Sequence, residues 1–355
     1  MNTKAGASHG PGERSGGEPV YILAVETSCD ETSVAIVRDG QEILSNVVSS
    51  QVATHERFGG VVPEVASRKH VETITCIIEE AIEQSGVSPA ALSAVAVTQG
   101  PGLVGSLLVG MVAAKTLALA LELPLIGVHH IAGHIYANQL VHELAYPFVA
   151  LVVSGGHTEL VYVESEGVFR IIGQTRDDAA GEAYDKVARA LKLPYPGGPH
   201  IDRLAHETGE GVTLPRAWLE PDSYDFSFSG LKSAVLAALN TAAMKGQPLA
   251  PEAVAKGFQD SVIDVLVEKA LRAVKAYGAK QLLLAGGVAA NKGLRAALEA
   301  RCAQAGVPLL APPLSLCTDN AAMIAAAAFL KYRRGQFAPL ELKAEPLLKL
   351  EAWSV

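Results

Sequence analysis

Residues 21–37 of this chain read YILAVETSCDETSVAIV. Tyr21–Val25 and Ser33–Val37 are short apolar runs typical of buried strands, and the polar residues between them predict the turn of a hairpin. The pattern returns at residues 148–164, FVALVVSGGHTELVYVE, where two apolar runs flank a polar turn that contains glycine. A supersecondary unit that occurs twice indicates an internal duplication, and both polar turns can face a ligand.

Segments of helical and extended character follow each hairpin. We expect helices over residues 64–84, from about 105 to 121, from about 130, over 181–191, 230–242 and 252–276, and from about 319, and strands over 41–49, 94–98, 125–128 and 281–284. Two lobes of the order β-β-β-α-β-α predict an α/β protein with a duplicated actin-like fold (ASKHA, RNase H-like), which holds a nucleotide between its lobes. A doubly wound dinucleotide-binding sheet is the alternative, but no G-x-G-x-x-G follows the first strand.

The duplication also predicts how the chain is divided. We expect a first lobe over residues 21–146, rejoined by a C-terminal helix at about 318–335, and a second lobe over residues 147–317. Residues 1–20 lack the apolar run of a signal peptide, and we interpret them as a disordered tail. Residues 336–355 are expected to form a C-terminal tail.

The composition predicts a soluble, cytoplasmic protein. Apolar residues make up 49% of the chain, yet no apolar stretch is long enough to cross a bilayer. Four scattered cysteines without a CxxC pair argue against disulfides and against a zinc ribbon. The net charge of −8 disfavours nucleic-acid binding unless a partner or a local basic face, such as residues 68–70 or 331–334, supplies positive charge.

A pair of histidines is spaced for a shared metal ion. His130 and His134 are four residues apart, so on a helix both imidazoles lie on one face. Asp319, at the start of an Ala-rich helix, offers a carboxylate as third ligand, and two His with one carboxylate leave positions open for substrate. The alternatives are two surface or capping histidines and an ordinary N-cap aspartate. Metalloprotease chemistry is disfavoured because Ile131 stands where a zincin has its glutamate.

Two glycine-rich turns are candidates for nucleotide binding. Ser154-Gly155-Gly156-His157 lies between two strands, and its glycines let backbone N–H groups approach a phosphate; an ordinary hairpin turn is the alternative. The segment 286–291 lies where a strand meets a helix and ends at Asn291, so it is either a ligand site or a helix cap.

Carboxylates occur in two further segments. The segment 177–186 is acidic, and it is either a solvated helix face or a source of ribose contacts. Asp30 and Glu31 lie in the first polar turn, where a carboxylate can orient water, a metal or a substrate amine. An aspartate in a tight turn is, however, a common structural feature.

A series of motifs occurs in order along the chain. They are VETSCDET (25–32), GVVPEVASR (60–68), QGPGLVGS (99–106), HHIAGH (129–134), VSGGHT (153–158), DDAAGE (177–182), FSFSGLK (226–232) and AGGVAAN (285–291). Over about residues 21–335 the chain resembles the TsaD/Gcp (Kae/Qri) family, in its bacterial branch. This resemblance implies a tRNA N6-adenosine threonylcarbamoyltransferase, which moves the threonylcarbamoyl group from threonylcarbamoyl-AMP to N6 of the tRNA adenosine beside the anticodon.

The resemblance also implies roles for individual residues. His130, His134 and Asp319 match the family's metal ligands, with Fe²⁺ favoured and Zn²⁺ as the alternative, and Asp30 and Glu31 match acidic residues needed for activity. The residues that match contacts to an adenine nucleotide or to threonylcarbamoyl-AMP are Val153, Ser154, Gly155, Gly156, His157, Asp185, Gly198, Asp202 and Asn291. The implied partners are the tRNA, a TsaB-type paralogous subunit and a TsaE-type P-loop ATPase, with a homodimer as a further state and no membrane.

The residues alone, without the resemblance, are also compatible with other functions. A sugar or carboxylate kinase of the same fold would use Mg²⁺ held by carboxylates and would not need paired histidines. A binding module whose nucleotide site only switches a complex is a third hypothesis, and metal-dependent proteolysis a fourth.

Overall fold

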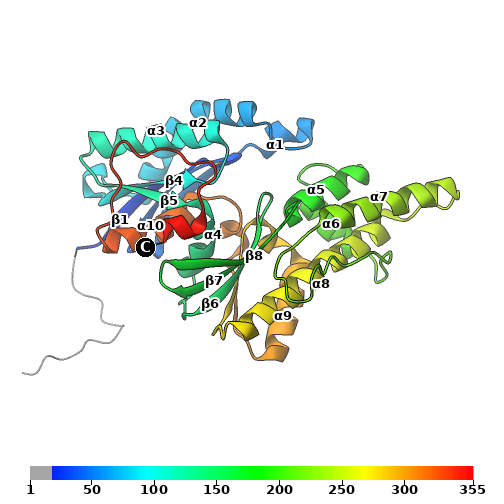
Figure 1. The fold of residues 1–355 in the computed structure, drawn as a ribbon. Helices are drawn as coiled ribbons and strands as arrows, with labels where there is room; N and C mark the ends of the chain where they lie inside the picture. Colours follow the sequence, from blue (N-terminus) through cyan, green and yellow to red (C-terminus); the bar gives the residue numbers. More distant parts are fainter. Residues whose placement is uncertain (1–17, 355) are drawn as a thin grey trace, which may run out of the picture.

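The computed structural model describes residues 18–354, and two five-stranded sheets form its framework (Figure 1). The first sheet has the strand order β3-β2-β1-β4-β5 and the second the order β10-β9-β6-β7-β8. The strands are β1 (Tyr21–Glu26), β2 (Glu31–Arg38), β3 (Glu42–Ser50), β4 (Ala94–Gly100), β5 (Leu125–His129), β6 (Phe148–Val153), β7 (Thr158–Ser165), β8 (Val168–Gln174), β9 (Leu282–Ala285) and β10 (Leu309–Leu310).

The two sheets share one topology. In each, the central strand pairs antiparallel with the second strand of its hairpin and parallel with a strand that arrives after a helix: β1 pairs with β2 and β4, and β6 pairs with β7 and β9. A third antiparallel strand, β3 or β8, completes each meander. The duplication that the two hairpins predict is therefore confirmed, including the positions of β1, β2, β6 and β7.

Helices cover both faces of each sheet. α2 and α3 lie on the outer face of the first sheet, α5 to α9 lie on the outer side of the second, and α4 and α10 lie between the sheets (Figure 1). The α-helices are α1 (Val52–His55), α2 (Pro63–Ser85), α3 (Val104–Ala120), α4 (His130–Tyr136), α5 (Ala180–Ala190), α6 (Gly197–Ala205), α7 (Ser229–Met244), α8 (Pro251–Ala276), α9 (Lys292–Ala305) and α10 (Ala321–Arg333).

The alternation of side chains along the central strands builds separate cores. In β1, Ile22 and Ala24 face the core between the sheets, whereas Leu23 and Val25 face α2 and α3. Strand β6 alternates in the same way between the central core and the core beneath α8. Both faces are buried, which explains why these strands are continuous apolar runs.

α10 is the element that both lobes share. Its alanines 325–328 are all fully buried in the central core. Small side chains let a helix approach its neighbours closely, and this positions the N-terminus of α10 beside α4.

The segment that follows α10 is packed against both sheets. Trp353 donates a hydrogen bond from Nε1 to the carbonyl of Gly127 at 2.8 Å, and the carboxylate of Glu351 accepts one from the N–H of Ile171 at 3.0 Å.

The predicted lobe boundaries stay a prediction. Most of the predicted disordered tail, residues 1–17, lies outside the described residues. Within residues 18–354, no helix is long and apolar enough to cross a membrane.

Candidate metal and nucleotide site

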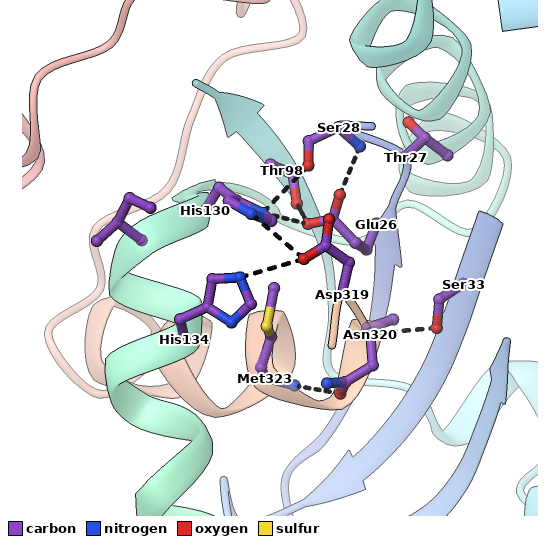
Figure 2. Close-up of polar contacts among 12 residues, drawn as sticks. Glu26, Thr27, Ser28, Ser33, Thr98, His130, His134, Asp319, Asn320 and Met323 are labelled. Carbon is purple, nitrogen blue, oxygen red and sulfur yellow. Dashed lines mark hydrogen bonds and ion pairs between the residues drawn. The ribbon is translucent and has the colours of Figure 1, made fainter. Parts of the chain in front are cut away.

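His130, His134 and Asp319 meet between the lobes (Figure 2). The two histidines lie on α4, which begins directly after β5, and Asp319 lies just before α10. The spacing of four residues puts the imidazoles on one face of the helix, with ring centroids 4.6 Å apart. The structure thus brings together three residues that the sequence separates by almost 190 positions.

One carboxylate oxygen faces both rings. Oδ1 of Asp319 lies 3.1 Å from Nε2 of His134 and 3.6 Å from Nε2 of His130. The histidine side chains are almost fully buried, at 1% and 8% exposure, and that of Asp319 is 19% exposed. The site is therefore closed on the helix side and reached past the carboxylate.

A second carboxylate, which the sequence analysis did not single out, contacts the other nitrogen of His130. Oε2 of Glu26, at the end of β1, lies 3.1 Å from Nδ1 of His130. The same oxygen accepts a hydrogen bond from Oγ1 of Thr98 at 2.6 Å. The Oγ of Ser28 also lies 3.1 Å from Nδ1.

The imidazoles and carboxylates of this group shift one another's pKa values. Burial lowers the pKa of His130, but the carboxylates of Asp319 and Glu26 outweigh burial and raise that pKa to about 9. Burial raises the pKa of Asp319, but His130 and His134 outweigh it and hold that pKa below its ordinary value. The carboxylate form of Asp319, which a cation needs, is therefore the stable one.

The geometry and the donor set fit a metal ion. One ligand atom from each of the three residues lies within 4.8 Å of the other two. Although Nε2 of His134 lies close to Asp319, it is buried and makes no hydrogen bond of acceptable geometry within the described part of the chain. An unsatisfied buried nitrogen is costly, and an ion at this point would satisfy it. Two imidazoles and one carboxylate suit iron or zinc with open positions.

The turn Ser154–His157 joins β6 to β7, and hydrogen bonds between its first and last residues close it. The N–H of Ser154 donates to the carbonyl of His157 at 2.8 Å, and the N–H of His157 donates to Oγ of Ser154 at 3.1 Å. Gly155 and Gly156 are exposed, and a Cβ on either would meet no atom of residues 18–354 within 4 Å. The backbone between the two ends is therefore open to a ligand.

The turn borders a cavity of about 620 Å³ between the lobes. His157 and Glu159 line it from the second lobe, Gly102 and His129 from the first, and residues 346–351 close one side. Burial, helped by the charges of His130 and His134, lowers the pKa of His157 to about 4, so its ring is neutral at pH 7. A cavity of this size is typical of small-molecule sites.

The candidate adenosine contacts come from α5, α6 and the start of α9, all in the second lobe. Asp185 on α5 accepts a hydrogen bond from the N–H of Gly197 at 2.7 Å. Gly198 lies in the first turn of α6, and a Cβ there would meet no atom of residues 18–354 within 4 Å. Val153, the last residue of β6, is fully buried, and its carbonyl would lie 2.4 Å from a Cβ on Gly286. The backbone of these turns is thus closely packed on the inner side.

Asp202 and Asn291 belong to one buried network. Asn291 caps α9 by accepting from the N–H of Leu294 at 2.8 Å, and its amide donates to Oε1 of Gln259 at 2.8 Å. Asp202 accepts from Nε2 of Gln259 at 3.0 Å and from the N–H of Lys292 at 3.0 Å. Both residues therefore support the start of α9, whatever contacts they make with a ligand.

Asp30 lies in the turn between β1 and β2, and Glu31 begins β2, close enough to Asp319 to interact with its charge. Burial raises the pKa of the Glu31 carboxyl well above its ordinary value, and the negative charges of Asp319 and Asp30 raise it further. Oγ of Ser50 donates to Oε1 of Glu31 at 3.2 Å. Glu31 is thus a carboxyl group that can hold a proton near the metal site.

Two duplicated sheets with a buried His–His–Asp group between them define an actin-like protein with a candidate metal site. Solved structures share this fold: the chain superimposes on full-length HypF with a TM-score of 0.61 at 15% identity, over 90% of this chain and 47% of that one. It superimposes on component A of the (R)-2-hydroxyglutaryl-CoA dehydratase of Acidaminococcus fermentans with a TM-score of 0.55 at 17% identity, over 89% and 98% of the chains. The predicted fold class is confirmed.

The family follows from closer relatives. The model of the TsaD family, tRNA N6-adenosine threonylcarbamoyltransferase, matches residues 42–326. Proteins of that name are 65% identical in Geobacillus kaustophilus, over 96% of this chain and 99% of the relative, and 64% identical in Bacillus thuringiensis (strain Al Hakam), over 93% and 97%. The chain belongs to the TsaD family.

Proposed function

We propose that the chain transfers a threonylcarbamoyl group to N6 of an adenosine in tRNA, the reaction that names its family. The observation that carries the proposal is the convergence of His130, His134 and Asp319 within 4.8 Å in a chain of this family. In finer detail, the donor is threonylcarbamoyl-AMP. The acceptor is adenosine 37 of tRNAs that read codons beginning with A, so the product is t⁶A.

The proposed ion is Fe²⁺, with Zn²⁺ as the alternative, held by Nε2 of His130, Nε2 of His134 and Asp319. Bound there, it would supply Lewis-acid polarisation of a carbonyl or phosphate oxygen. The buried ring of His134 and the carboxylate form of Asp319 support this assignment.

The chain's own groups bind the donor and remove a proton. The N–H groups of Gly155 and Gly156 make no hydrogen bond within residues 18–354, so they can donate to phosphate oxygens or to the oxygen that gains charge as the acyl group is attacked. Ser154, His157 and Val153 hold this turn in place. We assign Asp185, Gly198, Asp202 and Asn291 to the adenosine side of the donor.

An aromatic amine is a weak nucleophile, so loss of its proton must accompany attack. Asp30 and Glu31 are the carboxyl groups that we propose for this step, because they lie beside the metal site and Glu31 binds a proton more strongly than an ordinary glutamate. AMP leaves as the acyl group moves to N6.

Partners are part of the proposal. A chain with a net charge of −8 is a poor tRNA binder alone, so we propose that a TsaB-type paralogue and a TsaE-type P-loop ATPase assist it in the cytoplasm, and that the chain also forms a homodimer. An apolar surface on helix α3 supports the proposal of a protein partner. Its large apolar residues are 49–66% exposed, and they are Val104, Leu108, Val112 and Leu119.

The reaction class is tested by its products. With threonylcarbamoyl-AMP and unmodified tRNA, with and without the partner subunits, we expect AMP and modified adenosine to appear in equal amounts and the tRNA to gain no phosphate. Mass spectrometry of digested tRNA beside an AMP assay measures both. A phosphorylated small molecule that accumulates without AMP would show that the chain is a kinase.

Replacing Gly156 by valine tests the role of the turn. A Cβ at this position meets no atom of the described residues within 4 Å, so the variant is expected to fold normally. The branched side chain fills the space over the free N–H groups, and affinity for AMP or ATP should fall at least about tenfold, which corresponds to about 1.4 kcal/mol. Calorimetric titration measures this. Gly209→Val, at another exposed glycine with open space, is the matched control, and equal affinity in both variants would contradict the phosphate-binding role.

A further inference from the structure

Glu26 is a fully buried carboxylate outside the set of three metal ligands. A buried charge is costly unless it is paired and hydrogen-bonded, so its position at the end of β1 calls for a reason. The sheet does not need it, because the backbone of β1 already pairs on both sides with β2 and β4. Its side chain must therefore be explained by what it contacts.

Two hydrogen bonds fix the orientation of this carboxylate (Figure 2). Oγ1 of Thr98, on β4, donates to Oε2 at 2.6 Å, and the backbone N–H of Ser28, in the turn after β1, donates to Oε1. With both oxygens held, Oε2 lies 3.1 Å from Nδ1 of His130.

The contact determines which nitrogen of His130 can bind an ion. A neutral imidazole carries its hydrogen on one nitrogen, and only the other nitrogen has a free lone pair. Nε2 is the atom that faces Asp319, so an ion there requires the hydrogen on Nδ1, where it needs an acceptor. Oε2 of Glu26 is that acceptor. Ser28, the other neighbour of Nδ1, has a hydroxyl that can either donate or accept, so it does not select the tautomer by itself.

We propose that Glu26 is a positioning residue for the metal: it holds His130 in the tautomer and ring orientation that direct Nε2 at the ion. The inference rests on the proposed metal site. A carboxylate behind a histidine ligand also makes the ligand more basic and strengthens metal binding. Among residues 18–354, Glu26 and Asp319 are the only carboxylates that pair with His130, whereas His134 pairs with Asp319 alone. Of the two histidines, only His130 therefore has a second carboxylate behind its ring, in addition to Asp319.

Zinc affinity of the metal-free chain tests the proposal, measured by competition with a chromophoric chelator. Glu26→Ala should weaken zinc binding by roughly 10–100-fold, the range typical for loss of such a support. Glu26→Gln keeps the shape and an acceptor oxygen and should fall between the wild type and Glu26→Ala. Thr98→Val leaves the carboxylate but removes one of its donors, so a smaller loss is expected. Thr32→Val, which removes a buried hydroxyl that contacts His70 and Thr73, is the control with unchanged affinity.

The tautomer is read directly by ¹⁵N NMR of the zinc-loaded chain. We expect zinc on Nε2 and the hydrogen on Nδ1 of His130 in the wild type and in Glu26→Gln. In Glu26→Ala we expect a fraction of His130 rings that are unbound or bound through Nδ1, an effect that a general loss of stability would not produce. Zinc affinities of folded Glu26→Gln and Glu26→Ala within twofold of the wild type would overturn the proposal; if Glu26→Ala does not fold, unchanged affinity in Glu26→Gln and Thr98→Val does the same. Because the titration uses neither tRNA nor donor, an inactive wild type that shows the expected affinity series would refute the proposed function and leave this inference standing.

Discussion

Replacing Asp319 by alanine is expected to remove the metal ion and to abolish threonylcarbamoyl transfer. Oδ1 of this residue faces Nε2 of both histidines, so the substitution deletes the one charged ligand of the site. The loss of metal affinity should exceed the roughly 10–100-fold that removal of a group behind a ligand causes. Elemental analysis of the purified variant and a single-turnover transfer assay measure the two effects.

The control for Asp319→Ala is Asp264→Ala, which removes a half-exposed carboxylate that pairs with Arg216 on the second lobe. It should keep the full metal content and full activity. The double variant His130→Ala/His134→Ala should behave like Asp319→Ala, because either change leaves too few ligands. Full metal content in Asp319→Ala would show that the ion lies elsewhere, and full transfer without metal would show that the ion is not needed for the reaction.

Much of the framework can be predicted from the sequence because its central strands are buried on both faces. β6 is a continuous apolar run, and its bounds, Phe148–Val153, are those that the sequence predicts. β8 was not predicted, because it is an edge strand whose residues alternate in exposure, so it lacks such a run. Helix α6 was not predicted either: it begins with two glycines and a proline, which are poor helix formers. Asp185 compensates by accepting a hydrogen bond from the N–H of Gly197.

The residues of the candidate site could likewise be predicted only in part from the sequence. His130 and His134 are visible in the sequence because helix geometry links residues four apart. Glu26 is not, because its partners Thr98 and His130 are 72 and 104 residues away. They meet only because β1 and β4 are neighbours in the sheet and β5 leads into α4. Which strand ends lie together depends on the strand order, and a local pattern does not contain it.

A second large effect is expected where α4 and α10 touch. Gly133 lies between the two histidines' positions on α4, and a Cβ there would stand 2.8 Å from Cδ1 of Ile324 and 3.3 Å from Cγ of Met323 in the first turn of α10. The two γ methyl groups of a valine cannot fit without moving α10, and with it Asp319. Gly133→Val should therefore cost about 1–3 kcal/mol in the free energy of unfolding and weaken metal binding at least about tenfold. Denaturant unfolding and zinc titration measure the two quantities.

Two variants separate the packing effect from the general effect of valine in a helix. Gly133→Ala adds a single methyl group against the flexible end of Ile324, and the better helix propensity of alanine, about 1 kcal/mol, offsets the crowding, so stability and metal affinity should stay near those of the wild type. Gly230→Val places the same side chain in α7, at an exposed glycine whose Cβ would meet no atom of residues 18–354 within 4 Å, so it should not change metal affinity. If Gly133→Val bound zinc as tightly as Gly230→Val, the distance between α4 and α10 would not control the site. A loss confined to Gly133→Val would mean that the close packing of a glycine on α4 against α10 sets the position of the third ligand.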